Sequence, residues 1–173
     1  MIRARVLVGS PVITEQFNQV RLSVLGRQRS LPILQAEVSE MRAKMRHNHG
    51  TQTTLGGLGQ NAFNSDVIFD LKQDAGGIVD IEFMVQYAVL AWSWQYPQLV
   101  TYTDNIRILD GLGAESLLSA DHVRMLQEAY KAYRAAAHRL ALQKQQGVVD
   151  GNLFTNERHA VMNVWQELGL SYL

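Results

Sequence analysis

A short central segment of the chain carries the residue types that could do chemistry. Lysine can bind a phosphate group, and paired glycines allow a tight turn that approaches a ligand closely. Two carboxylates spaced by two residues could share a divalent metal ion if they pointed the same way. The segment spans residues 69–83 and contains Lys72, Gly76-Gly77, Asp80 and Glu82.

The two acids have two possible geometries. Val79-Asp80-Ile81-Glu82-Phe83 alternates apolar and acidic residues, and on a strand both carboxylates would lie on one face. From Ile78 to Trp92, however, apolar residues recur at steps of three and four, which is typical of a helix. On a helix the two acids diverge by about 200° and are poor partners for one ion. We therefore predict a helix start with no metal pair, in which Asp80 complements the helix dipole or contacts a ligand.

The residues before that helix predict a turn. Ile68, Asp70 and Lys72 alternate, which favours a short extended segment near 67–72. Gly76-Gly77 then lies at the boundary, where the free N–H groups of a helix start would form a generic anion site. Lys72 is either a phosphate ligand there or an ordinary exposed lysine. Arg107, which has apolar neighbours, could pair with Asp80 or Glu82 inside the fold.

The rest of the chain predicts an all-α fold, a bundle of about six helices in a single domain, 1–173. Ser10 and Ser119 are N-cap residues, Thr103 is a third, and glycines close several helices. The long helix has an apolar seam with seven-residue spacing, typical of antiparallel bundles. A polar, glycine-rich stretch near 48–66 has no period and predicts a flexible loop. The helices are expected near 10–26, 30–47, 78–95, 103–113, 119–147 and 155–169.

Composition limits the partners. The 173 residues include 16 basic and 16 acidic ones, so no net charge favours nucleic acid or a membrane surface. The chain has no cysteine, which excludes disulfides, thiolate metal sites and cysteine catalysis and fits a cytoplasmic protein. No apolar run approaches the ~20 residues that span a bilayer. The sequence opens abruptly, inside an apparent structural element, and we expect a fragment of a longer protein.

Several spaced motifs occur in a fixed order along the chain. They are Arg3-Ala4-Arg5-Val6, Glu37-Val38, Met41-Arg42, Asp70-Leu71-Lys72, Gly76-Gly77-Ile78, Asp80-Ile81-Glu82-Phe83, Gln86-Tyr87 and residues 103–109. Together they resemble one family, the bifunctional glutamine synthetase adenylyltransferase/adenylyl-removing enzyme of bacteria. The likeness runs from the first residues to near the end, apart from the loop at 48–66.

This resemblance implies an enzyme with two nucleotidyltransferase domains, each followed by a helical domain. The C-terminal half uses ATP and Mg²⁺ to transfer AMP to a tyrosine of glutamine synthetase, and the N-terminal half removes it by phosphorolysis. Glutamine and the PII signal protein regulate the balance. The removing half tends to carry Arg-Glu where this chain has Val79-Asp80, which implies that the chain belongs to the adenylylating half.

One departure from the family pattern is important. The family's metal-binding Asp-x-Asp motif occurs nowhere in the 173 residues, although nucleotidyl transfer needs such carboxylates to hold magnesium. We expect a catalytic core upstream and no activity or tight cofactor binding by this chain alone. Lys72, the Gly76-Gly77 turn, Asp80, Glu82 and Arg107 would then face the active-site cleft. The alternatives are a regulatory, protein-binding helical module and the equivalent helical domain of a PII uridylyltransferase.

Overall fold

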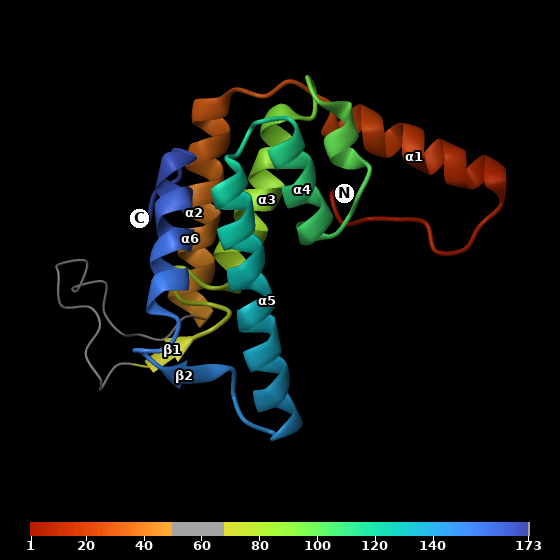
Figure 1. Cartoon of the computed structure of the whole chain (residues 1–173). Coiled ribbons are helices and arrows are strands. Elements are labelled where there is room, and N and C mark those ends of the chain that lie inside the picture. Colours follow the sequence, from red (N-terminus) through yellow and green to blue (C-terminus); the bar gives the residue numbers. More distant parts are fainter. Residues whose placement is uncertain (50–67, 173) are drawn as a thin grey trace.

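The computed structural model describes residues 1–49 and 68–172, and within these ranges the predicted all-α fold is confirmed. The described residues form six α-helices, a short 3-10 helix and two short strands (Figure 1). The predicted loop at 48–66 overlaps the end of a helix at residues 48–49, and its other residues lie outside the described residues. The elements are α1 (Pro11–Leu25), α2 (Leu31–His49), β1 (Ile68–Asp70), α3 (Ile78–Trp92), η2 (Pro97–Val100), α4 (Asn105–Ala114), α5 (Ala120–Leu142), β2 (Val148–Asp150) and α6 (Thr155–Glu167).

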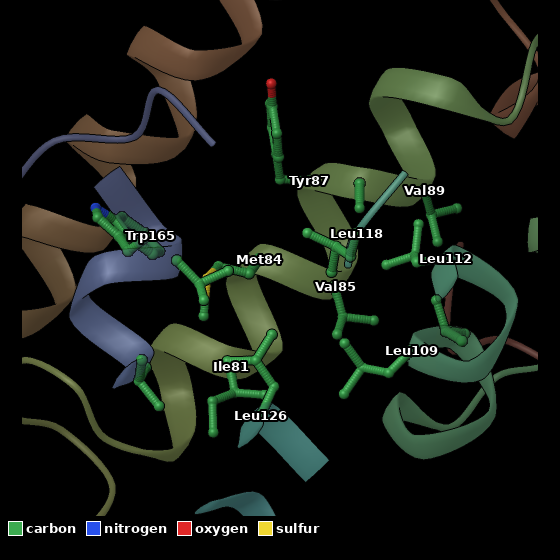
Figure 2. Close-up of a cluster of buried hydrophobic side chains, with 14 of the residues drawn as sticks. Ile81, Met84, Val85, Tyr87, Val89, Leu109, Leu112, Leu118, Leu126 and Trp165 are labelled. Atoms are coloured by element: carbon green, nitrogen blue, oxygen red, sulfur yellow. The ribbon is translucent and has the colours of Figure 1, made fainter. Parts of the chain in front are cut away.

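Helix α3 is the centre of the bundle, in contact with α2, α4, α5 and α6. Its apolar residues are not confined to one stripe, which is typical of a helix surrounded by others. Figure 2 shows Met84 pointing toward Trp165 of α6, whereas Val89 lies on the opposite side near Leu112 of α4. The helix that carries the two acids is therefore held from several sides.

The helix starts follow local capping chemistry. Ser10 and Ser119 cap α1 and α5, because each side chain accepts a hydrogen bond from the backbone N–H three residues on. The prediction for α4 was one residue off. Asp104, rather than Thr103, is its cap and accepts from the backbone N–H of Arg107 at 3.0 Å.

The extended segment before α3 is also confirmed, but its partner was not predicted. β1 pairs antiparallel with β2, and Phe69 lies opposite Val149. The Leu71 N–H continues the contact by donating to the Gly147 carbonyl at 3.0 Å. This two-stranded sheet fixes the residues before α3 to the connection between α5 and α6.

The predicted seam of the long helix α5 is confirmed in part. Its residues Val123, Leu126 and Tyr133 are buried, whereas Tyr130, Ala137 and Leu140 are only partly buried. Because α5 packs against α3, α4 and α6 together, its contacts turn the buried face away from a simple two-helix seam. The buried residues are Val123, Leu126, Ala129, Tyr133 and Ala136.

Helix α1 departs most from the expected bundle. Figure 1 shows it running away from the other helices. The apolar residues Ile13, Phe17, Val20 and Val24, which the sequence spaces as one helix face, do not join the core, since Ile13 is 58% and Val20 55% exposed. Residues 1–10, which the sequence placed inside a structural element, form turns and irregular backbone instead.

Candidate functional site

In the turn between β1 and α3, the backbone N–H groups form hydrogen bonds within the chain. The Asp70 carboxylate accepts from the N–H groups of Lys72 at 2.8 Å and Gln73 at 2.9 Å. The backbone N–H groups at the start of α3 also have partners within the chain. The Ile78 N–H donates to the Leu71 carbonyl at 2.9 Å, and the Val79 N–H donates to the Lys72 carbonyl at 3.1 Å. The free N–H groups expected of an anion-binding helix start are therefore already bonded within the chain.

Packing explains the two glycines. Gly76 has a φ of +80°, in the region that favours glycine, and a Cβ there would lie 2.8 Å from the Arg158 carbonyl of α6. A Cβ on Gly77 would lie 2.9 Å from the Leu71 carbonyl. Both positions are buried. The double glycine thus lets α6 approach the turn and lets the turn fold on itself.

Asp80 is fully buried beneath this turn. One carboxylate oxygen accepts from Arg42 Nε at 2.5 Å. The other accepts from the Gly76 N–H at 2.7 Å and from the Tyr172 hydroxyl at 2.8 Å. Three donors, from α2, the turn and the C-terminal segment, therefore satisfy one buried charge. Asp80 therefore holds these three segments together.

The pair of Arg42 with Asp80 was not predicted from the sequence. Met41 is 61% exposed, whereas its neighbour Arg42 is 1% exposed. The buried face instead continues from Leu34 and Val38 in steps of four to Arg42. The Arg42 guanidinium also donates to the Gln73 carbonyl at 2.7 Å. The sequence signal for this pair was an arginine at the same spacing as the apolar residues of α2, because a buried arginine needs a carboxylate partner.

Tyr172 closes the network from the C-terminal end. Its ring stacks on Trp165 with centroids 5.2 Å apart, and the Arg46 guanidinium lies 5.2 Å from the ring centroid. Burial, followed by the negative charge of Asp80, raises the pKa of the Tyr172 hydroxyl well above its ordinary value. The hydroxyl therefore stays protonated and remains a donor to Asp80.

Glu82 has a different environment, although it lies only two residues further along α3. Its side chain is 20% exposed, and one oxygen forms an ion pair with Arg3 Nη2 at 3.0 Å. The same oxygen accepts from the Tyr130 hydroxyl of α5 at 3.3 Å. The Arg134 guanidinium donates to that hydroxyl at 3.4 Å and lies 5.7 Å from the ring centroid. Glu82 thus links the N-terminal segment to the exposed side of α5.

Two hollows lie beside α5, one at the start of α4 and one at the start of α3, and we call them together the α3–α5 groove. The first has a volume of about 330 Å³ and includes Arg3, Asp104, Tyr130 and Arg134 in its lining. The second, about 410 Å³, is lined by residues that include Lys72, Ile78 and Ala137. Lys72 therefore lines the second hollow, whereas Glu82 contacts Arg3 and Tyr130 in the lining of the first.

The expected ion pair of Arg107 with Asp80 or Glu82 is wrong. Arg107 Nε instead bonds Asp104 at 2.5 Å, and its guanidinium lies 4.4 Å from the ring centroid of Tyr102. Burial opposes ionisation of Asp104, but hydrogen bonds from the Arg107 backbone and side chain outweigh it and lower the pKa of Asp104. Asp104 thus pairs with Arg107 from three residues away. Asp104 itself lines the first hollow, and Arg107 is connected to the hollow through this pair.

The described residues offer little to a metal ion. Among them, no three His, Cys, Asp or Glu side chains gather closely enough to hold one. The donor set of residues 1–49 and 68–172 therefore does not fit a magnesium site. For a nucleotide phosphate, the turn has no spare backbone donor between Gly76 and Val79, and the exposed Lys72 side chain is the available cation beside it. In the same part of the chain no helix is long and apolar enough to cross a membrane.

Comparison with known proteins first gives the class. The chain belongs to the GlnD PII-uridylyltransferase family, whose model matches residues 39–167. Over nearly its whole length it is also similar to curated proteins named bifunctional glutamine synthetase adenylyltransferase/adenylyl-removing enzyme. These relatives confirm the resemblance drawn from the sequence motifs.

The identities are high, but the relatives are much longer. The chain is 61% identical over 171 residues to the Pseudomonas syringae protein, which covers 99% of this chain and 17% of that relative. It is 60% identical to the Pseudomonas aeruginosa protein over 98% of this chain and 17% of the relative. The Nitrosococcus oceani protein is 45% identical over 97% of this chain and 16% of its own length. The chain thus spans about 17% of the length of the two Pseudomonas relatives.

Proposed function

We propose that this chain is the helical part that follows the nucleotidyltransferase core in the adenylylating half of such an enzyme. The complete protein would use ATP and Mg²⁺ to transfer AMP to a tyrosine of glutamine synthetase, and its other half would remove the AMP. The observation that carries this proposal is the 61% identity to a bifunctional adenylyltransferase across 99% of the chain. The motif residues 70–83 lie within that matched length.

The groove geometry supports distinct roles for the candidate residues. Lys72 lines the α3–α5 groove, and Glu82 contacts its lining residues Arg3 and Tyr130. Both would face the active-site cleft, with Lys72 available to a phosphate group. Gly76, Gly77 and Asp80 would support the cleft by fixing the turn, because all three are buried. Arg107 would contribute at the rim through Asp104. The magnesium that supports nucleotidyl transfer would be held by carboxylates of the core.

The partners follow from the same proposal. Glutamine synthetase would be the protein substrate, and glutamine and the PII protein would regulate the complete enzyme. The chain alone would not transfer AMP, since it lacks the Asp-x-Asp carboxylates. The cytoplasmic location expected from the absence of cysteine stays a prediction.

The test measures incorporation of radiolabelled AMP into glutamine synthetase by the full-length enzyme. Lys72→Ala should lower the initial rate by about tenfold or more, a typical loss for one charged contact to a reacting phosphate. Lys131→Ala, at an exposed position of α5, is the matched control and should keep the rate. Equal rates for both variants would mean that Lys72 is an ordinary surface lysine.

A second candidate function comes from the family model, which carries the name of a uridylyltransferase. In that case the full-length enzyme would transfer UMP from UTP to the PII protein. The same assay separates the two functions when ATP with glutamine synthetase is compared with UTP and PII protein. If neither reaction occurs, the non-catalytic binding module is the better account.

A further inference from the structure

Helix α1 carries an apolar stripe that the rest of the described chain does not cover. The stripe consists of Ile13, Phe17, Val20 and Val24, spaced by four, three and four residues. Ile13 and Val20 are each more than half exposed, and Phe17 and Val24 are only partly buried. Leu7 and Val8, in the segment that leads into the helix, are 79% and 95% exposed.

The protruding helix is firmly anchored at its C-terminal end. The buried Arg21 guanidinium donates to the carbonyls of Met1, Ile2 and Val100. The Ser93 hydroxyl donates to the Leu25 carbonyl at 2.7 Å, and Arg29 donates to the same carbonyl at 2.9 Å. Figure 1 shows the other end of α1 far from the bundle. These bonds fix the direction in which the stripe extends.

The surface of α1 is nearly free of charge. Of its 15 residues, Glu15 and Arg21 are the only charged ones, and Arg21 is buried. Depletion of charge around exposed aliphatic and aromatic side chains is typical of the core of a permanent interface. A stripe of this kind on a free surface would also favour aggregation.

We infer that the α1 stripe, with Leu7 and Val8, is the docking surface for the nucleotidyltransferase domain of the same polypeptide. This inference rests on the proposed function. The relatives supply the occupant, because about five sixths of their length lies outside the match to this chain. The docked domain would also lie beside Arg3, which the N-terminal segment places on the α3–α5 groove. The anchored helix would set the position of the catalytic core relative to that groove.

Hydrogen–deuterium exchange tests this surface in the full-length enzyme and in the 173-residue chain. Amides of residues 11–25 should exchange at least about tenfold more slowly in the full-length enzyme, because docking suppresses local opening. Ile13→Glu with Val20→Glu should remove that protection. Asn18→Glu with Leu22→Glu adds the same charge on the opposite side of α1 and should keep it. Circular dichroism of each variant chain checks that the helices persist.

Two results would overturn the inference. Equal exchange of α1 in both proteins would mean that no domain covers the stripe. Concentration-dependent protection in the 173-residue chain, with a dimer in sedimentation, would assign the surface to a second copy. AMP transfer by the wild-type full-length enzyme is measured separately. A missing activity would contradict the proposed function and leave the exchange result intact.

Discussion

Asp80 and Glu82 lie two residues apart on the same helix, yet they belong to different regions of the molecule. Asp80 faces inward and meets three donors under the closed turn. Glu82 contacts Arg3 and Tyr130, two residues that line the α3–α5 groove, at a partly exposed site. Residues two positions apart on a helix point to nearly opposite sides. One short acidic motif can therefore supply both a structural anchor and a surface group.

Residues of one motif therefore need not share one role. The turn and Asp80 bury their polar groups and satisfy them within the chain. The groove instead leaves cations and a carboxylate within reach of solvent. Changes in the turn network should therefore reduce folding stability, and changes in the groove should leave stability nearly unchanged.

The largest effect should follow removal of the buried charge. Asp80→Ala leaves Arg42 buried without its carboxylate and should lower the free energy of unfolding by about 3–5 kcal/mol. Chemical denaturation of the 173-residue chain measures this loss. Glu82→Ala is the comparison, and it should lose no more than about 1 kcal/mol, as for exposed pairs. Equal losses would remove the distinction between the two acids.

The next largest effect concerns the turn itself. Gly76→Ala places a Cβ against the Arg158 carbonyl and keeps a positive φ, so it should destabilise the fold by about 2–4 kcal/mol. Gly147→Ala is the matched control, because a Cβ there meets nothing within 4 Å. That variant should change stability by less than about 0.5 kcal/mol. If Gly76→Ala unfolds at the wild-type denaturant midpoint, the close approach of α6 does not need the glycine.

A smaller, pH-dependent effect should come from Tyr172. Its pKa is raised in the folded state above the ordinary value of 10.0, so its contribution is complete below that pH and is lost as the pH rises toward the folded pKa. Burial also raises the pKa of Tyr87 and Tyr133. Each group should add a slope of about 1.4 kcal/mol per pH unit above about pH 10.

Tyr172→Phe isolates that contribution. It should cost about 1–3 kcal/mol at neutral pH, the usual range for a hydrogen bond to a charged group. It should also make the fall in stability above pH 10 shallower than in the wild-type chain. Urea denaturation at a series of pH values measures both quantities. An unchanged alkaline slope would show that the Tyr172 hydroxyl is not held in its protonated form.

The smallest expected stability effect lies in the groove. Arg134→Ala removes an exposed guanidinium next to Tyr130 and should change the free energy of unfolding by less than about 1 kcal/mol. Thermal unfolding, followed by circular dichroism, measures it. A loss as large as that of Gly76→Ala would mean that the groove, like the turn, is part of the core.

The sequence predicts the helices well because their signals are local. Ser10 and Ser119 act through hydrogen bonds within one turn, and the period of α3 follows from its own residues. Long-range pairs are a different matter. Arg42 and Asp80 are 38 residues apart, and Tyr172 approaches Asp80 from 92 residues further on. No local period reports such contacts, so the sequence could place Asp80 on a helix but could not show that it is enclosed.

The same limit explains the error at Arg107. Its apolar neighbours suggested a partner inside the fold, but Asp104, the N-cap residue three positions before it, pairs with it instead. The pairing of β1 with β2 was missed for a related reason. Each strand has only three residues, which is too short for a reliable alternating pattern.

The division between Asp80 and Glu82 is tested most directly in the full-length enzyme by measuring melting temperature and initial rate of AMP transfer for the same variants. Asp80→Asn should lower the melting temperature by at least about 5 °C, and below that temperature its rate should stay within about threefold of wild type. Glu82→Gln should keep the melting temperature within about 2 °C and lower the rate by about tenfold, since it releases Arg3 and Tyr130 in the groove. The reverse pattern, a stable but inactive Asp80→Asn and a fully active Glu82→Gln, would contradict the account.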